Sequence, residues 1–182
     1  MNIEFQRRAA PLLGLLLAIC AAHWGMAHAA DPAPRELDWT ELMPADYQPD
    51  MLLADEEIGN LDDADPRAAE LLSKLQALWR DAPVVRALDG AEVRLPGFAI
   101  PLDTDTKIAK SFILVPYYGA CIHTPPPPSN QIVLVRAPQG ARIEEAFAMV
   151  WVTGRLRVEA QQTDVAHAGY TLDASSVAPY EE

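Results

Sequence analysis

A cysteine and a histidine two residues apart are the side chains of this chain best suited to chemistry. Cys121 and His123 lie within the fourteen residues 117–130, and side chains at positions i and i+2 of an extended backbone point to the same face. Thiolate and imidazole are ligands that Zn²⁺ and Cu⁺ prefer, so the pair predicts two ligands of one metal ion. His167 is the candidate for the third ligand, ahead of Asp164.

Two other interpretations of this pair remain open. Cys121 could be a buried thiol beside a histidine that hydrogen-bonds the loop backbone. An imidazolium at His123 would instead lower the pKa of the thiol and give a reactive thiolate. Because no oxyanion-stabilising element is recognisable, the sequence does not predict an enzyme, although thiol chemistry at Cys121 is not excluded.

Four consecutive prolines, Pro125, Pro126, Pro127 and Pro128, follow the pair directly. Such a run adopts polyproline II and makes its segment stiff. It is predicted to hold Cys121 and His123 in place, and the alternative is a ligand for an aromatic-lined groove on another protein. Three neighbouring residues are expected to complete the loop scaffold: Gly119, Asn130 and Gln131.

The N-terminus has the three parts of a secretory signal. Arg7 and Arg8 supply a positive region, and residues 12–22 form an apolar run that is too short for a permanent membrane span. Ala27-His28-Ala29 gives the small-x-small pattern that signal peptidase recognises. Cleavage between Ala29 and Ala30 is therefore predicted, with export to the periplasm and with an uncut membrane anchor as the alternative.

Cys20 offers a second form of processing. A cysteine at the end of the apolar run is where a bacterial lipoprotein is cleaved and acylated, although the branched Ile19 just before it is unfavourable. The chain is therefore expected to be a soluble periplasmic protein, with a lipoprotein anchored at Cys20 as the alternative.

The charge of the chain limits its partners. The 182 residues carry a net charge of −12, and removal of residues 1–29 would leave 153 residues with a charge of −13 and a single thiol at Cys121. Phosphate backbones would repel such a surface, and no basic stripe offsets the charge, so nucleic acid is not expected as a partner. A lone cysteine in an oxidising compartment indicates a buried thiol, a metal ligand or an intermolecular disulfide.

Residues 30–63 are predicted to be an irregular acidic arm. Twelve acids but only one base, Arg35, occur between residues 31 and 66. Four apolar side chains interrupt the acids and are expected to dock on the domain: Trp39, Leu42, Met43 and Tyr47. A low-affinity cation site is the alternative, but the acids lack the fixed spacing of a calcium loop.

Residues 64–182 are predicted to form one domain. Asp65 and Pro66 are favourable for a helix start, and leucines at three- and four-residue intervals indicate an amphipathic helix over 65–80. Five strands are expected at 93–102, 111–116, 131–136, 150–158 and 170–177, with a short helix over 141–149. This order predicts a mainly β fold with some α, a small five-stranded OB-like barrel with one N-terminal amphipathic helix, and a sandwich is the alternative.

Several motifs together resemble one family. The central ones are FILVP at 112–116, GACIH at 119–123 and PPPPSNQIV at 125–133, and they are supported by LMP at 42–44 and LPGF at 95–98. They are similar to the signature of DUF3299, a bacterial family of unknown function, and the likeness extends over nearly the whole chain beyond the signal. A run of five prolines is typical of the family, whereas this chain has four followed by Ser129.

The resemblance implies an exported, often lipid-anchored OB-like protein with an accessory role beside ABC-type transport systems, in some bacteria within zinc-responsive gene clusters. The leading hypothesis is therefore a periplasmic accessory or binding protein, associated with a transport system and with zinc homeostasis through Cys121, His123 and His167. The alternative is a protein–protein interaction module that uses the polyproline loop and the acidic arm to bind a transporter or another periplasmic protein. A thiol enzyme is the third hypothesis.

Overall fold

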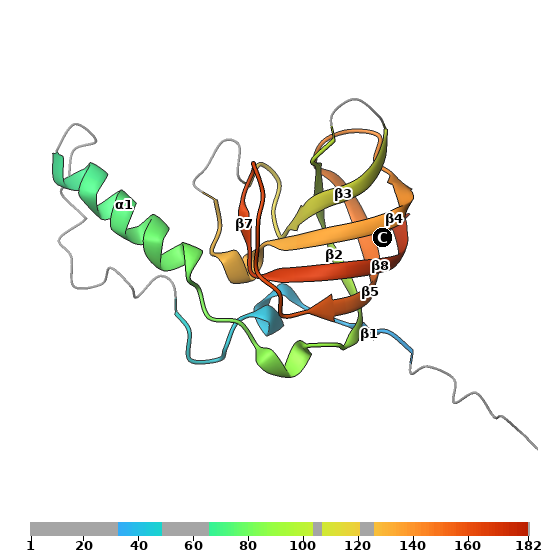
Figure 1. Ribbon diagram of the computed structural model, residues 1–182, viewed down its shortest axis with the longest axis horizontal. Helices are drawn as coiled ribbons and strands as arrows, with labels where there is room; N and C mark the ends of the chain where they lie inside the picture. The colour runs from blue at the N-terminus through green and yellow to red at the C-terminus, as the bar shows by residue number, and fades with distance from the viewer. Residues whose placement is uncertain (1–32, 49–65, 104–106, 121–125, 182) are drawn as a thin grey trace, which may run out of the picture. The chain divides into compact units, whose positions relative to one another are not determined.

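The computed structural model describes residues 33–48, 66–103, 107–120 and 126–181, and residues 33–182 form one compact unit (Figure 1). Both predicted domain boundaries, after residues 29 and 63, fall outside the described residues and stay predictions. The principal elements are α1 (Pro66–Arg80), β2 (Glu92–Pro101), β3 (Ile108–Val115), β4 (Val133–Arg142), β5 (Ala148–Arg157) and β8 (Tyr170–Pro179). The short elements are β1 (Arg35–Glu36), η2 (Trp39–Leu42), η5 (Arg86–Leu88), η6 (Ser129–Gln131), β6 (Gln161–Gln162) and β7 (His167–Ala168).

Five strands close into a barrel in the order β2-β3-β4-β8-β5, and β5 pairs back with β2 (Figure 1). The β4–β8 pair is parallel and the other four pairs are antiparallel. Closure removes the exposed strand edges that an open sheet would present. The predicted five-stranded OB-like barrel with a single N-terminal helix is confirmed.

Alternation of side chains along the strands builds the interior. In β5 the residues Val150, Val152 and Leu156 are buried while their neighbours are half-buried or exposed. This period of two is the pattern of a strand with one face in a core. The barrel interior is therefore filled by side chains and offers no channel.

Part of the acidic arm packs against the barrel. Leu37 and Leu42 are buried in the same core cluster as the strand residues. The indole Nε1 of Trp39 donates to the carbonyl of Pro96 at 2.7 Å. A Cβ on Gly97 would lie 2.9 Å from the Trp39 ring, so the absence of a side chain at this position makes room for the indole. The arm is thus a structural part of the barrel.

Helix α1 differs from the packing helix that its leucine stripe predicts. Its bounds agree with the predicted 65–80 to within a residue, and Asp65 lies outside the described part of the chain. None of its side chains is buried, and Leu72 and Leu78 are 44% and 38% exposed. Leu72 and Leu78 are therefore exposed, whereas Leu71, Leu75 and Trp79 of the same helix are half-buried.

The predicted helix over 141–149 is wrong. Residues 141 and 142 belong to β4 and pair with Ala109 and Ile108 of β3, and β5 begins at Ala148. Ala141 and Ile143 are buried while Arg142 is exposed, which is strand periodicity. Glu144-Glu145-Ala146 lie in the connection between β4 and β5, and no helix forms there despite the helix propensity of this stretch.

A second buried cluster lies apart from the barrel interior. It joins Ala120 and Ile132, which flank the proline segment, to Ala166 and Ala168, which flank His167. The second cluster thus fixes the relative positions of the proline segment and the short β6–β7 hairpin.

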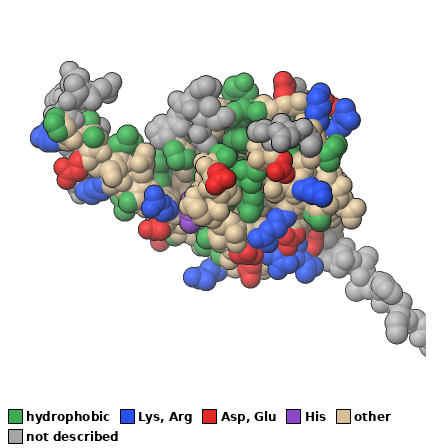
Figure 2. Space-filling view, turned by 45° about the horizontal axis from the view of Figure 1, so that its top comes forward, with side chains coloured by type: hydrophobic (Ala, Val, Ile, Leu, Met, Phe, Trp, Pro, Cys, Tyr) green, Lys and Arg blue, Asp and Glu red, His purple; other side chains and the backbone are tan. Residues whose placement is uncertain are grey.

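Charged side chains of both signs are mixed over the visible face of the barrel (Figure 2).

Candidate functional site

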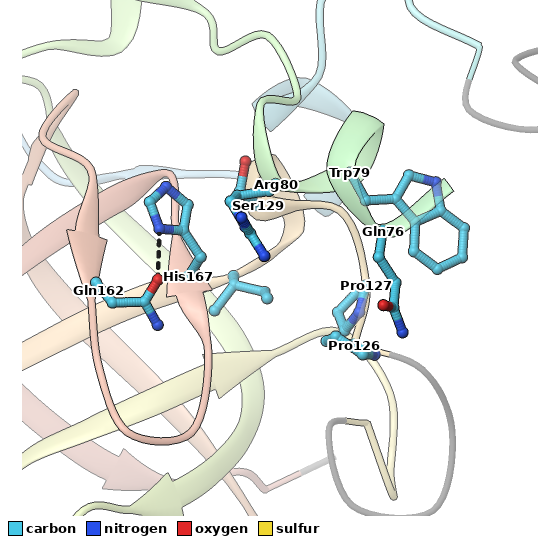
Figure 3. A pocket seen from close by; sticks show the side chains of 9 residues that line it. Gln76, Trp79, Arg80, Pro126, Pro127, Ser129, Gln162 and His167 are labelled. Carbon is cyan, nitrogen blue, oxygen red and sulfur yellow. Dashed lines mark hydrogen bonds between the residues drawn. The ribbon is translucent and has the colours of Figure 1, made fainter. Parts of the chain in front are cut away.

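Three segments far apart in sequence meet around a pocket of about 250 Å³ (Figure 3). The last turn of α1, the residues that lead into β4, and the β6–β7 hairpin each contribute side chains. The lining residues are Gln76, Trp79, Arg80, Pro126, Pro127, Ser129, Ile132, Gln162 and His167. Figure 3 shows Trp79 and Gln76 on the side of the two prolines, and Arg80 on the side of Ser129 and His167.

The end of α1 is fixed by the residues that follow it. The helix stops at Arg80, before Asp81-Ala82-Pro83, because the residue before a proline disfavours helical backbone. Ala82 is buried, and the side chain of Asn130 donates to the carbonyl of Pro83 at 2.7 Å. Arg80 and Trp79 are therefore held beside the residues that precede β4.

The proline segment is packed against the domain. Pro127 is buried, whereas Pro126 is exposed. The carbonyl of Ser129 accepts from the backbone N–H of Gly169 at 2.7 Å, and a Cβ on Gly169 would lie 2.8 Å from that oxygen. Gln131 is also buried, and its side chain donates to the carbonyl of Trp39 at 2.9 Å. This segment therefore links the pocket to both β8 and the arm.

The β6–β7 hairpin presents His167. Its turn is held by the hydroxyl of Thr163, which accepts from the backbone N–H of Ala166 at 3.0 Å. His167 Nδ1 lies 3.1 Å from Gln162 Oε1. An amide oxygen can only accept, so Nδ1 carries the proton in this hydrogen bond. The other ring nitrogen, Nε2, is left for a ligand.

The pocket has an unusual charge for this protein. None of the nine described lining residues is an aspartate or glutamate, although the chain has 26 of them. Arg80 has no ion pair among the residues that the structure describes. An arginine without a described carboxylate partner can bind ligand groups that accept hydrogen bonds or carry negative charge.

The sequence-predicted site residues are placed only in part. Cys121, His123 and Pro125 lie outside the described residues, whereas Pro126, Pro127 and His167 lie together in the pocket. Gly119 sits in a turn with φ of +83°, a conformation that suits glycine. In the described ranges, no three His, Cys, Asp or Glu side chains form a metal-binding group.

Sequence reasoning missed the contributions of Gln76, Arg80 and Gln162 to this site. Trp79 lies within the amphipathic helix predicted over 65–80, but the sequence predicts no role for it in a site. The signal that could have pointed to Arg80 is its position as the last helical residue before a proline-bounded turn. Its closeness to the proline segment depends on the tertiary fold.

None of the helices in the described ranges has the length and apolar character needed to cross a membrane. Proteins with curated descriptions include no match to this chain. A crystal structure of a DUF3299 family protein from Pseudomonas aeruginosa PAO1 is similar, with 42% sequence identity and a TM-score of 0.64. The match covers 82% of this chain and 98% of that one. The profile described as "Protein of unknown function (DUF3299)" matches residues 39–179, and the chain therefore belongs to the DUF3299 family.

Proposed function

We propose that this protein is an exported accessory or binding protein that works with a transport system in the periplasm and binds its ligand in the pocket beside α1. The observation that carries the proposal is that the pocket unites the proline segment with His167. Concave sites with a few convergent polar groups are where proteins usually bind small ligands. The transport association comes from the family resemblance.

Zinc is the proposed ion, with Cys121, His123 and His167 as its ligands. His167 is oriented as metal-binding histidines usually are, with one ring nitrogen donating to an oxygen and the other left open. Removal of a signal would also take away Cys20, His23 and His28, leaving these three as the thiol and imidazole ligands.

A zinc titration of the purified protein tests this proposal. Wild type is expected to bind zinc and to melt at a higher temperature in its presence, because binding to the folded state alone stabilises it. Cys121→Ser and His167→Gln should each weaken binding by about tenfold or more, as the loss of a ligand requires. Arg86→Gln, a change at an exposed residue outside the pocket, is the control. Unchanged melting of wild type with zinc would exclude the metal role.

Export is tested by fractionation of cells that express the full-length gene. We expect the protein in the periplasm, with a mature N-terminus at Ala30. Cys20→Ser should leave the product unchanged. A lipid-modified product that is lost in this variant would instead establish the lipoprotein alternative.

The second candidate function is a protein–protein interaction module. The exposed stripe of α1, with Leu72 and Leu78, favours it because apolar helix faces commonly dock on partners. Burial of Pro127 disfavours the proline run as the recognised element. Leu72→Ser with Leu78→Ser should abolish co-purification of a transporter component, whereas Cys121→Ser should not affect it.

A binding role is proposed here in preference to catalysis. A reactive thiolate at Cys121 would be alkylated faster at pH 6 than a free thiol, because its pKa would be lowered. We expect alkylation no faster than that of a free thiol. A faster reaction would favour the thiol enzyme.

A further inference from the structure

We infer that the pocket beside α1 binds a small carboxylate with an apolar body, and that Arg80 and Ser129 are the residues that anchor the carboxylate. This inference rests on the proposed function only in placing the ligand in the same pocket. It requires neither zinc nor the residues between Ala120 and Pro126.

Charge selects an anion. The chain carries 26 acids, yet the nine described residues that line the pocket include one arginine, one histidine and no acid. Arg80 is unpaired among the described residues, so its guanidinium keeps its full charge for a ligand. An anion in this pocket would be attracted by Arg80.

The hydrogen-bond donors select a carboxylate. The guanidinium of Arg80 has donors in a planar fork that fits the two oxygens of a carboxylate. Ser129 is only 3% exposed and lines the pocket, and its hydroxyl makes no hydrogen bond to any described residue. This hydroxyl can therefore donate a hydrogen bond to an acceptor on a ligand.

The other lining residues favour a ligand whose non-carboxylate part is apolar. Trp79, Pro126, Pro127 and Ile132 give the pocket an apolar surface with one aromatic ring. The volume of about 250 Å³ lies below the usual range of drug-sized sites, so the ligand is small. Inorganic phosphate would leave these apolar walls without contacts, which favours an organic acid.

Calorimetric titration with phenylacetate tests the inference, with EDTA present to remove metal. Phenylacetamide is the matched neutral ligand, and it is expected to bind at least tenfold more weakly because it lacks the charge that Arg80 recognises. Arg80→Gln should weaken phenylacetate binding by about tenfold or more, and Ser129→Ala should weaken it severalfold. Arg86→Gln removes the same charge outside the pocket and should leave the affinity unchanged. Melting curves show whether each variant is folded.

A peptide that ends in a phenylalanine carboxylate, and its C-terminal amide, distinguish the two sources of such a group. Selective binding of the peptide acid alone assigns the site to chain termini, and binding of phenylacetate assigns it to free acids. Equal affinities for acid and amide, binding of neither acid, binding of inorganic phosphate in place of both acids, or an unaffected Arg80→Gln variant would overturn the inference. Cys121→Ser separates the proposals, since it should weaken zinc binding by about tenfold or more and leave phenylacetate binding intact.

Discussion

The hydroxyl of Tyr170 joins three parts of the chain inside the protein. It donates to the carbonyl of Leu42 at 2.8 Å and accepts from the backbone N–H of Val85 at 2.6 Å, and the residue is fully buried. One side chain on β8 therefore satisfies backbone groups of the arm and of the segment after α1. Both groups lose their partner if the hydroxyl is removed.

Tyr170→Phe is expected to lower the free energy of unfolding by about 1–3 kcal/mol. The substitution keeps the ring but leaves the carbonyl of Leu42 and the backbone N–H of Val85 without their hydrogen-bond partner. Urea denaturation measures the change. Tyr180→Phe, at a half-buried tyrosine stacked on Trp151, is the control and should cost less than about 0.5 kcal/mol. Equal stabilities of the two variants would contradict the bridging role.

The same tyrosine makes stability depend on alkaline pH. Burial raises the pKa of Tyr170, and it raises that of Tyr47 as well. A raised pKa means that the folded state holds the proton more tightly, so this stabilisation is complete below the ordinary tyrosine pKa of about 10 and is lost as pH rises above it. We expect a fall in wild-type stability above pH 10 that is shallower in Tyr170→Phe, because Tyr47 then acts without it. Identical slopes would show that Tyr170 is not involved.

At the scale of residues, the sequence shows which residue types are present, but it does not show which of them lie close together in the fold. Cysteine and histidine are common metal ligands, so Cys121, His123 and His167 could be named as candidate ligands from spacing and count. Arg80 and Ser129 are common residue types, and their proposed role comes from a shared pocket in which no described lining residue is an acid. No local pattern encodes that meeting, because it depends on how α1 ends relative to the proline segment.

Among the elements, the arm packs against β2 at Gly97, where the absence of a side chain leaves room for the ring of Trp39. A Cβ at Gly97 would lie 2.8 Å from Leu114 Cγ, 2.9 Å from the Trp39 ring and 2.9 Å from the carbonyl oxygen of Val115. Gly97→Ala is therefore expected to cost about 1–3 kcal/mol by overpacking, measured by urea denaturation. The Trp39→Ala background is the matched comparison.

In that background the cost of Gly97→Ala should be smaller, since one of the three close contacts is gone. A double-mutant cycle measures the difference as a coupling energy between Trp39 and Gly97. Zero coupling would mean that Leu114 and Val115 alone create the strain, and the arm would not depend on the glycine.

The elements themselves were largely predictable because the strands of the barrel are apolar and mostly buried. Continuous apolar runs located β3 and β4, in which residues 112–115 and 133–135 are all buried, and alternation located β5. The leucine stripe that follows Pro66 located α1. The predicted helix over 141–149 failed because pairing of β4 with β3 extends beyond Val135 across a bulge between Ala109 and Ser111. A bulge and the length of a strand pairing depend on both strands together, so the sequence of one strand alone does not show them.

For the whole molecule, acids outnumber bases, and most of the excess belongs to residues outside the described part of the chain. The net charge of the chain is −12, and the ion pairs in the described residues, such as Arg157–Asp173 and Lys107–Glu144, are exposed. Exposed pairs contribute about 0–1 kcal/mol each and are weakened by salt. Repulsion among the excess acids opposes the compact state and is also weakened by salt.

We expect repulsion to outweigh these pairs, so the melting temperature should rise as NaCl is increased to about 0.15 M, where charges beyond about 8 Å are screened. Glu145→Gln with Glu181→Gln removes two exposed acids that have no ion pair in the described part of the chain. This variant should melt higher than wild type at low salt and respond less to NaCl, because less repulsion remains to be screened. A melting temperature that falls with salt would show instead that the surface ion pairs act as a stabilising network stronger than the excess charge.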